Sequence, residues 1–420
     1  MLRISTASFL KRQFKRKNLR KLTKCDFSSS NQVPTQADVV VIGGGVAGCN
    51  LLYQLSKRGI QAVLLEQGKL TNGTTWHTDG LLWRLSRPSD VDITLLEASK
   101  NIYLGLEQDT GVDPGLVQHG GIFIARKDER LEEYKRLHTF AHYFDIDTQI
   151  ISPSDAAKLS PILDPTKFIA ALYSPQDGHI DPTMLCSSLV KGATKRGAQV
   201  IENCRLTNIL TEPVANMRKI TGIETSLGKI KTGCVVNSAG VWSRDVSLML
   251  GLDIPLVPMK HAYIVTDSVP EVRSTPNIRD HDGNLYIKIQ GDSINLGGYE
   301  INPEILKEVA QDFSFAQYEL DMSIFEVHLE RAKEICPIFN TIGIKSTVCG
   351  PESFTPDHKP LIGEDPKVLG LFYNCGYNSG GMQLSGGCAE QLAIWIATGG
   401  PEIQMFNLRH KKIQQTATNR

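Results

Sequence analysis

The sequence predicts an α/β fold made of a parallel-sheet unit and a second unit with a mixed sheet. Three observations predict it. Residues 37–66 show strand, helix and strand patterns in turn, and residues 255–349 alternate apolar and polar side chains. The length of 420 residues exceeds what one hydrophobic core usually holds. The chain is 41% hydrophobic and has no apolar run near the roughly 18 residues of a membrane span, so we expect a globular protein without one.

Segment 1–36 is predicted to be a mitochondrial transit peptide with a linker, which implies a location in the mitochondrial matrix. Residues 1–25 are rich in Lys and Arg, contain no Asp or Glu, and lack the unbroken apolar centre of a secretory signal. A disordered basic arm that contacts RNA or anionic lipid is the alternative. Acidic residues exceed basic ones in the remainder of the chain, so no nucleic-acid partner is expected.

The nine cysteines are scattered and form no Cys-x-x-Cys pair. This pattern predicts neither a zinc site nor a disulfide framework, and it fits a reducing compartment. We therefore expect no metal centre, and we expect most of the thiols to be small buried apolar groups.

A strand, helix and strand open the folded part of the chain. The β-branched run 37–42 leads into a glycine-rich turn, and residues 46–58 place apolar side chains at helical spacing. Gly59 ends that helix before a second apolar run at 62–66. This order predicts one βαβ unit, in which the turn after the first strand meets the N-terminus of the helix.

The turn carries the pattern Gly-x-Gly-x-x-Gly at Gly43, Gly45 and Gly48. The first glycine turns the chain, the second lets the backbone approach a pyrophosphate, and the third lets the helix pack on the strand. Glu66 ends the second strand, where a carboxylate can accept hydrogen bonds from a ribose. Motif and context together predict a Rossmann-like dinucleotide site.

The middle of the chain mixes helical and strand patterns. Helices are expected at 89–111, 129–144 and 181–196, with short strands at 121–125 and between 199 and 237. The alternation at 255–349 predicts an antiparallel sheet with one face packed and one face on a cavity. A glycine-rich string at 371–382 and an apolar helix at 387–398 follow.

These patterns predict a discontinuous organisation. The cofactor-binding domain is expected at 37–90, 150–254 and 345–400, the substrate domain at 91–149 and 255–344, and a tail at 401–420.

Four strings at 73–83, 177–182, 261–266 and 343–360 resemble the sarcosine and dimethylglycine dehydrogenase family of the D-amino-acid-oxidase-like flavoproteins. The likeness runs over about residues 37–408 and is closest to the sarcosine dehydrogenase members. It implies a glutathione-reductase-like FAD-binding domain with an inserted mixed-sheet substrate domain.

The resemblance implies FAD held covalently through His77, in a Thr- and Gly-lined segment just beyond the predicted phosphate site. The glycine motif places Gly43, Gly45 and Gly48 at the cofactor, and the small residues after the apolar strand 235–237 bring the backbone of Gly240 close to it. The resemblance also implies the following contacts to FAD: Val46, Ala47, Glu66, Gln67, Thr74, Thr75, Gly80, Leu81, Leu206, Trp242, Gly376, Asn378, Gly380, Gly381 and Met382. Cys349 is expected to be a neighbour of FAD without a bond to it.

His261 and Tyr286 are expected on adjacent alternating strands, and the resemblance implies that they orient the substrate amine and manage its proton. A core tyrosine is the alternative for Tyr286. Lys288 shares the face of Tyr286 by the two-residue period and is a weaker candidate for an anchor of the substrate carboxylate. A solvated strand lysine is equally consistent with the pattern.

The resemblance implies FAD-dependent oxidative N-demethylation of sarcosine, or of a related N-methyl amino acid, to glycine and formaldehyde. It also implies electron-transfer flavoprotein as the electron acceptor. Dimethylglycine oxidation, an oxidase reaction with oxygen, and a non-catalytic regulatory flavoprotein like the regulatory subunit of pyruvate dehydrogenase phosphatase are the alternatives.

Two departures from the family pattern stand out. Asp79 replaces a small apolar residue, and it is expected either to lower the flavin reduction potential or to point to solvent. The family continues into a folate-binding, aminomethyltransferase-like module, and with this chain ending at Arg420 we expect a flavin-binding half alone.

Overall fold

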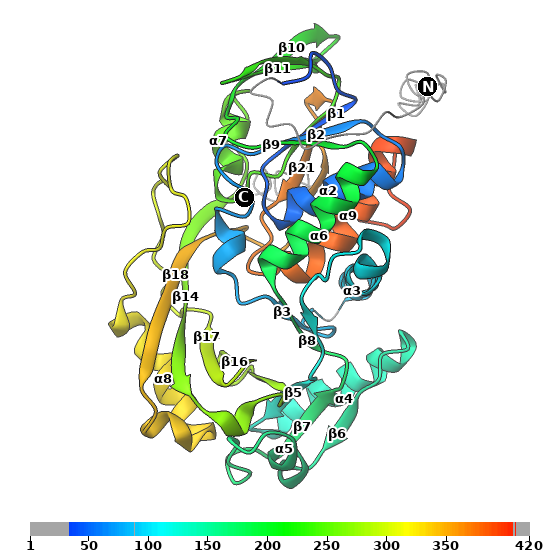
Figure 1. The fold of residues 1–420 in the computed structure, drawn as a ribbon. Helices are drawn as coiled ribbons and strands as arrows, with labels where there is room; N and C mark the ends of the chain where they lie inside the picture. Colours follow the sequence, from blue (N-terminus) through cyan, green and yellow to red (C-terminus); the bar gives the residue numbers. More distant parts are fainter. Residues whose placement is uncertain (1–32, 88, 406–407, 409–420) are drawn as a thin grey trace.

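The computed structural model describes residues 33–87, 89–405 and 408 (Figure 1). Nearly all of the predicted transit peptide and most of the predicted tail therefore lie outside the described residues. Within the described ranges, no helix has the length and apolar character needed to cross a membrane. The same part of the chain holds no cluster of His, Cys, Asp and Glu suited to a metal ion.

A six-stranded sheet forms the upper half of the molecule in Figure 1, in the order β19-β21-β13-β1-β2-β9. All neighbouring strands pair in parallel except β19 with β21. The strand bounds are β1 Val39–Ile42, β2 Ala62–Leu65, β9 Gln199–Ile201, β13 Val235–Asn237, β19 Leu361–Glu364 and β21 Leu371–Cys375. The predicted βαβ unit is confirmed, with α2 at Val46–Lys57 between β1 and β2.

Both faces of this sheet are covered, which explains why β1 is apolar at every position. Val39 and Val41 pack into the core made with α2, α3, α6 and α9, whereas Val40 and Ile42 pack into a second core on the other face. The helices of the first core are α2, α3 Asp90–Thr110, α6 Pro182–Lys195 and α9 Gly381–Thr398. The second face is covered by β10 Leu206–Val214, β11 Met217–Thr225, β12 Gly228–Lys231, β20 Val368–Leu369 and α7 Ser243–Leu248.

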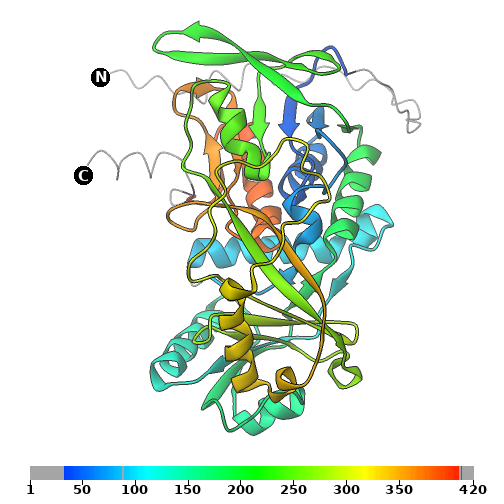
Figure 2. The ribbon, with the colours of Figure 1, turned by 90° about the vertical axis from the view of Figure 1, so that its left-hand side faces the viewer.

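An eight-stranded sheet forms the lower half, in the order β18-β14-β17-β16-β15-β5-β7-β6. Its pairs are antiparallel, as expected for 255–349, except that β15 runs parallel to β5. The bounds are β5 Gly121–Ala125, β6 Gln149–Ile151, β7 Ala170–Ser174, β14 Val257–Ser268, β15 Asn277–Asp280, β16 Leu285–Gln290, β17 Ser293–Gly298 and β18 Ile344–Phe354. The long strands β14 and β18 rise from this sheet toward the first one (Figures 1 and 2).

Helix α8 (Met322–Ile335) packs on the outer face of the eight-stranded sheet. Phe325 and Ile335 of the helix share a core with Ile264, Ile287 and Leu296 of the strands. Helices α4 Asp128–Tyr143 and α5 Pro153–Leu159 lie beside β5 to β7. A small sheet of β3 Leu81–Leu82, β4 Leu116–Val117 and β8 Gly178–Ile180 lies between the two halves (Figure 1). The predicted α/β architecture, with a parallel-sheet unit and a second unit built on a mixed sheet, is confirmed.

The domain boundaries stay a proposal, and four elements pack in ways that would move them. Helix α3 packs on α6 and α9 of the first unit, although it falls in the predicted substrate domain. Conversely, β6, β7 and β18 pair within the eight-stranded sheet, although most of their residues fall in the predicted cofactor domain. Each exception arises because strand pairing and helix packing join segments that are distant in sequence.

Helix α9 begins at Gly381, six positions before the predicted start at 387. The glycines at its start are typical of a loop in the sequence, but in the structure they let α9 pack closely on another helix. A Cβ at Gly387 would overlap the backbone of Leu95 in α3, and one at Gly386 would overlap Ser99. Each glycine in a helix costs up to about 1 kcal/mol in propensity, and the close approach of two helices offsets it.

We predict that Gly387→Ala destabilises the fold although alanine favours helices. The added methyl group must displace α3, and such overpacking costs about 1–3 kcal/mol. Gly105→Ala is the matched control, because Gly105 lies exposed in α3 with no atom near its missing Cβ. We expect a gain of up to about 1 kcal/mol there. Urea unfolding of the two variants checks this, and equal stabilisation by both would contradict the packing argument.

Candidate functional site

Two adjoining pockets lie between the six-stranded sheet and the eight-stranded sheet. The first, of about 1300 Å³, is lined by the ends of β1, β2, β13 and β21 and by the first residues of α2 and α9. The second, of about 1250 Å³, lies against the inner face of the eight-stranded sheet. Their linings share Thr78, Glu352, Asn378, Ser379 and Met382. A ligand in the first pocket can therefore meet a ligand in the second.

The glycine turn between β1 and α2 forms the floor of the first pocket. Gly43 has a φ of +107°, and a Cβ there would crowd the carbonyl of Ser238. A Cβ at Gly45 would lie 2.9 Å from the hydroxyl oxygen of Thr75. Gly48 does not line the pocket, because it faces the backbone of Gly43. The first two glycines thus keep the turn open to a ligand, and the third brings α2 close to β1.

Glu66 at the end of β2 is buried on the lining of the first pocket. Its carboxylate accepts hydrogen bonds from the backbone N–H of Gly44 at 2.7 Å and of Gly68 at 2.8 Å. Burial raises the pKa of this carboxyl group, and the two N–H donors work against that rise. Each oxygen retains a lone pair, so the carboxylate can still accept a ligand hydroxyl.

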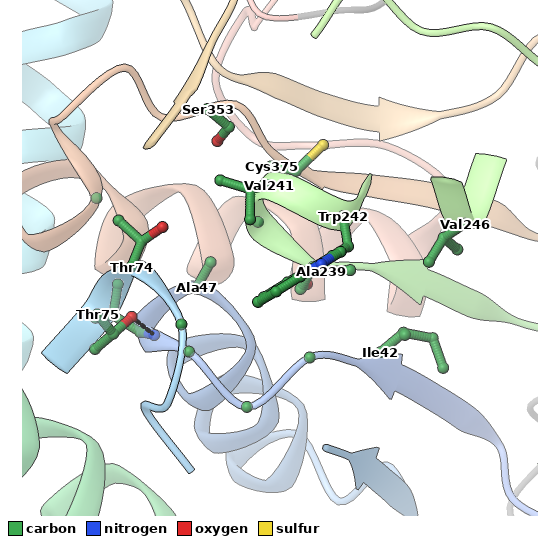
Figure 3. A pocket seen from close by; sticks show the side chains of 18 of the residues that line it. Ile42, Ala47, Thr74, Thr75, Ala239, Val241, Trp242, Val246, Ser353 and Cys375 are labelled. Atoms are coloured by element: carbon green, nitrogen blue, oxygen red, sulfur yellow. Dashed lines mark hydrogen bonds between the residues drawn. The ribbon is translucent and has the colours of Figure 1, made fainter. Parts of the chain in front are cut away.

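A 3-10 turn at Thr74–His77 forms one wall of the first pocket, facing Trp242 in Figure 3. The hydroxyl of Thr75 accepts a hydrogen bond from the N–H of Val46 at 3.0 Å, which ties this turn to the first residue of α2. The hydroxyl of Thr74 donates to the carbonyl of Pro351 in β18 at 2.7 Å. The turn therefore connects the glycine floor with the eight-stranded sheet.

Most of the other predicted cofactor contacts lie on one of the two linings. Asn378 holds the loop before α9, since its amide accepts from the N–H of Thr355 at 2.7 Å and donates to the carbonyl of Gly376 at 2.6 Å. The first pocket is lined by Val46, Ala47, Gln67, Leu206, Gly240, Gly376, Asn378, Gly381 and Met382. The second is lined by His77, Gly80, Leu81 and Gly380.

His77 is buried at the entrance to the second pocket, and its imidazole lies on the backbone of β18 at Gly350. A Cβ at Gly350 would overlap the ring. The Nε2 atom is buried and has no hydrogen-bond partner. Burial, helped by the charge of His261, lowers the pKa of His77 to about 4. The imidazole is therefore neutral near pH 7, with a free nitrogen lone pair or N–H at Nε2.

The inner face of the eight-stranded sheet carries a cross-strand row of Tyr263, Gly297, Tyr286 and Arg279. The prediction that His261 and Tyr286 lie on adjacent strands is wrong, because β17 pairs between β14 and β16. Gly297 of β17 has no side chain, and the end of the Tyr286 ring lies in the vacated space. Both residues nevertheless line the second pocket.

His261 forms an ion pair with Glu300, in which Nδ1 lies 2.9 Å from Oε2. The other carboxylate oxygen accepts the N–H of Ala262 at 3.0 Å, which holds the carboxylate beside the ring. Burial opposes a charge on His261, yet Glu300 outweighs burial and raises the pKa to about 9. The side chain is therefore an imidazolium at neutral pH, a proton donor and not a base.

Lys288 is buried and does not line the second pocket. Its Nζ lies 3.5 Å from Oδ1 of Asp79 and donates to Oε1 of Gln290 at 3.0 Å. Asp79 is buried too, and Asn295 donates to its Oδ1 at 2.7 Å. The expectation that Asp79 points to solvent is therefore wrong, as is the solvated alternative for Lys288. The two charges balance one another, with Asp79 on the lining of the second pocket and Lys288 behind it.

Cys349 lies on the opposite face of β18 from His77 and Glu352. It pairs with Ala262 of β14 and packs in the apolar core under α8. Burial raises the pKa of its thiol to about 11. The thiol therefore points away from both pockets, and Cys349 lines neither of them, which does not support its expected place beside FAD. That it makes no bond to a cofactor stays a prediction.

Four residues that line the second pocket, or contact a residue that lines it, are not predicted from the sequence. Tyr263 lies two positions from His261, so the two-residue period could have found it. Arg279 and Glu352 have no such local signal, because only the strand register brings them to His261 and Tyr286. Glu300 follows the end of β17 and meets His261 because β17 pairs with β14. Arg279 is half-buried in the second pocket, and its guanidinium lies 5.7 Å from the ring centre of Tyr299.

We predict that Glu300→Gln moves the pKa of His261 from about 9 to below 6.5, because burial, together with the charge of Arg279, then outweighs the remaining attraction of Glu352. A folded-state pKa above the ordinary 6.5 means that protonation stabilises the fold below about pH 6.5, and that this contribution is lost as pH rises through about 9. NMR of ¹⁵N-histidine-labelled protein measures the pKa, with His261→Asn to assign the signal.

Glu304→Gln is the control for this titration. Glu304 pairs with Lys260 at the surface, 2.9 Å from its Nζ, and does not contact His261. The pKa of His261 should stay near its value in the unaltered protein. A His261 that titrates near 6.5 in both the unaltered protein and Glu300→Gln would contradict the ion-pair account.

Comparison with known proteins gives consistent matches. The DAO family of FAD-dependent oxidoreductases matches residues 38–395. Mitochondrial sarcosine dehydrogenase of Mus musculus is 47% identical over 393 residues, 93% of this chain and 43% of the mouse protein. Mitochondrial dimethylglycine dehydrogenase of Rattus norvegicus is 33% identical over 385 residues, 89% of this chain and 44% of the rat protein. The chain thus spans less than half the length of these relatives.

Among solved structures, L-proline dehydrogenase from P. horikoshii superposes with a TM-score of 0.82 at 24% identity. The superposition covers 91% of this chain and 99% of the other. This likeness concerns the fold, and it agrees with the pairing of a parallel sheet and a large mixed sheet described above. With the family match extending over 38–395, the chain belongs to the DAO family of FAD-dependent oxidoreductases.

Proposed function

We propose that this chain holds FAD in the first pocket and oxidises the N-methyl group of sarcosine in the second, yielding glycine and formaldehyde. The observation that carries the proposal is the junction of the two pockets at Glu352, Asn378 and Met382. A cofactor that crosses this junction would present its reactive edge to the inner face of the eight-stranded sheet. The polar side chains of that face include His261, Tyr263, Arg279, Tyr286 and Glu352.

The residues of the first pocket fit FAD. The bare backbone at Gly43 and Gly45 can receive a pyrophosphate at the N-terminus of α2, where N–H groups and the helix dipole favour an anion. The buried carboxylate of Glu66 can accept a ribose hydroxyl. Trp242 offers an apolar wall, and its indole N–H is already engaged by the carbonyl of Val309 at 3.2 Å.

His77 would hold FAD covalently. The proposal rests on its buried and unpartnered Nε2 atom, in a neutral imidazole that lines the second pocket. A neutral ring nitrogen is nucleophilic, and this one makes no competing hydrogen bond. Burial and Gly350 hold the ring in place, so the nitrogen would meet the cofactor without reorganisation.

FAD, when bound, supplies the two-electron oxidant, and the protein's own residues orient the substrate. We propose Arg279 as the anchor of the substrate carboxylate in place of Lys288. Its guanidinium lines the second pocket, and among the described residues no carboxylate forms an ion pair with it. Arginine binds carboxylates with paired hydrogen bonds, so an unneutralised guanidinium in a pocket suits this role.

The tyrosines and His261 would position the amine end. Burial raises the pKa of Tyr286 and of Tyr263, and the charge of Asp79 adds to both shifts, so the two phenols keep their protons. His261 is also protonated and stacks on Tyr299 with ring centres 5.4 Å apart. The pocket wall therefore donates hydrogen bonds, which orients the substrate, while Trp83 and Phe123 shield it from water.

The substrate and the cellular setting come from the relatives. The higher identity to a protein named sarcosine dehydrogenase than to one named dimethylglycine dehydrogenase supports sarcosine. Both relatives are named as mitochondrial, which supports a mitochondrial location, and we place the chain in the matrix. Electron-transfer flavoprotein as the electron acceptor rests on the family resemblance alone.

We predict that anaerobic sarcosine bleaches the flavin absorbance of the purified protein. Arg279→Gln should weaken sarcosine binding about 100-fold with a smaller effect on the limiting reduction rate, because a charge-assisted pair contributes about 1.5–3 kcal/mol. Arg279→Lys should bind sarcosine with an affinity between those of the unaltered protein and Arg279→Gln. Arg196→Gln is the control, because it removes a surface partner of Asp109 and should change neither the affinity nor the reduction rate. Stopped-flow absorbance provides the dissociation constant and the rate.

Two outcomes of that experiment would count against the proposal in different ways. Absence of bleaching by sarcosine or any other N-methyl amine would contradict the proposed reaction. Bleaching with unchanged affinity in Arg279→Gln would leave the reaction intact and show that another group anchors the carboxylate.

A further inference from the structure

Glu352 of β18 holds a carboxylate where the two pockets meet. We propose that Glu352 is a specificity-determining residue that accepts the N–H of the substrate amine and thereby selects secondary N-methyl amines over tertiary ones. This inference rests on the proposed function and adds to it the chemical class of amine that the site takes.

The backbone aims Glu352 toward both pockets. It pairs with Met259 of β14, two positions beyond the pair of Gly350 with His261, so Glu352 and His261 point from the same face of the sheet. The residue is 5% exposed and lines the first and the second pocket. The carboxylate is therefore close to any group that reacts across the junction.

The carboxylate has an unused acceptor. The side chain of Ser379 bonds to it, but the Oε2 atom is buried without a hydrogen-bond partner. A buried carboxylate oxygen left in this state is costly, by about 1–3 kcal/mol or more. Burial raises the pKa of Glu352, and the charge of Glu300 adds to that rise, whereas the charge of His261 and the Ser379 hydroxyl oppose it. A ligand that brings an N–H to Oε2 would remove this cost.

Amine chemistry identifies that ligand. A methylated amine must lose its ammonium proton before its nitrogen lone pair can support oxidation of a neighbouring carbon. Neutral sarcosine then retains one N–H, whereas neutral N,N-dimethylglycine retains none. In this arrangement Oε2 accepts that N–H and Arg279 binds the carboxylate, so neither contact uses the methyl group that is oxidised.

A tertiary amine would fit this arrangement poorly. Its second methyl group would lie against Oε2, and the buried carboxylate would remain without a partner. Sites built to bond a substrate N–H reject the analogue that lacks it for this reason. The discrimination is thus expected to arise from Glu352 and not from pocket volume.

The test compares the flavin-loaded protein with Glu352→Gln and Glu352→Leu in anaerobic stopped-flow reduction by sarcosine and by N,N-dimethylglycine. For each amine, the limiting reduction rate divided by the dissociation constant gives an apparent second-order rate constant. In Glu352→Leu, the constant for sarcosine should fall, so its ratio to the constant for dimethylglycine should decrease about 10- to 100-fold. Glu352→Gln keeps an acceptor oxygen, so its ratio should lie between those of the unaltered protein and of Glu352→Leu. Glu364→Gln is the control, since Glu364 is a partly buried carboxylate bonded to the N–H of Gly370 outside both pockets.

A second measurement does not depend on turnover. (Methylthio)acetate carries a carboxylate and a methyl group but no N–H, and its binding can be followed by the perturbation of flavin absorbance. Its dissociation constant should stay within about twofold in Glu352→Gln, which is close in shape to the native side chain. A larger loss would show that Glu352 contacts the carboxylate end or shapes the pocket, and would overturn the assignment.

The remaining outcomes separate this inference from the proposed function. An unchanged sarcosine-to-dimethylglycine ratio in both Glu352 variants would overturn the inference while leaving sarcosine oxidation intact. Equal losses for both amines together with lower FAD content would also overturn it, because Oε2 would then serve the cofactor. Failure of either amine to reduce the unaltered protein would overturn the proposed function, and this inference with it.

Discussion

The contact of the His77 imidazole with the backbone of β18 at Gly350 is the constraint on which the rest of the site depends. Any side chain at position 350 would overlap the ring. The contact joins the 3-10 turn beside the glycine floor to the longest strand pair of the eight-stranded sheet. Because Glu352 follows two positions later on the same face, this contact also fixes where the two pockets meet.

The charges around this junction are arranged so that few are left unpaired. His261 is balanced by Glu300, and Lys288 by Asp79. The buried atoms without a hydrogen-bond partner on the pocket lining include Nε2 of His77, Oδ2 of Asp79 and Oε2 of Glu352, and Arg279 has no ion pair among the described residues. We propose that Arg279 and Glu352 are the two that meet the substrate. A molecule with a carboxylate at one end and an N–H at the other complements both. The apolar core under α8 holds the sheet that carries these groups.

The sequence predicts the parts of this site that are local. The βαβ unit, the glycine turn and Glu66 follow from apolar periodicity and one motif, and the family resemblance adds His77, His261 and Tyr286. The sequence alone does not show which distant strands pair. Strand β17 separates His261 from Tyr286, and only register brings Arg279 and Glu352 to them. The start of α9 is mispredicted for a related reason, because its glycines pack against α3, which is distant in sequence.

The proposed covalent attachment of FAD to His77 is the part of this account that an experiment can test most directly. The measurement is the fraction of flavin that remains with the protein after acid precipitation, with mapping of the flavin-bearing peptide. Attachment at His77 is expected in the unaltered protein and in Cys349→Ala, none in His77→Ala, and a fraction reduced about tenfold or more in Gly350→Ala, where the new methyl group must displace the ring. Flavin that stays attached in His77→Ala, or attachment unaffected by Gly350→Ala, would contradict the account.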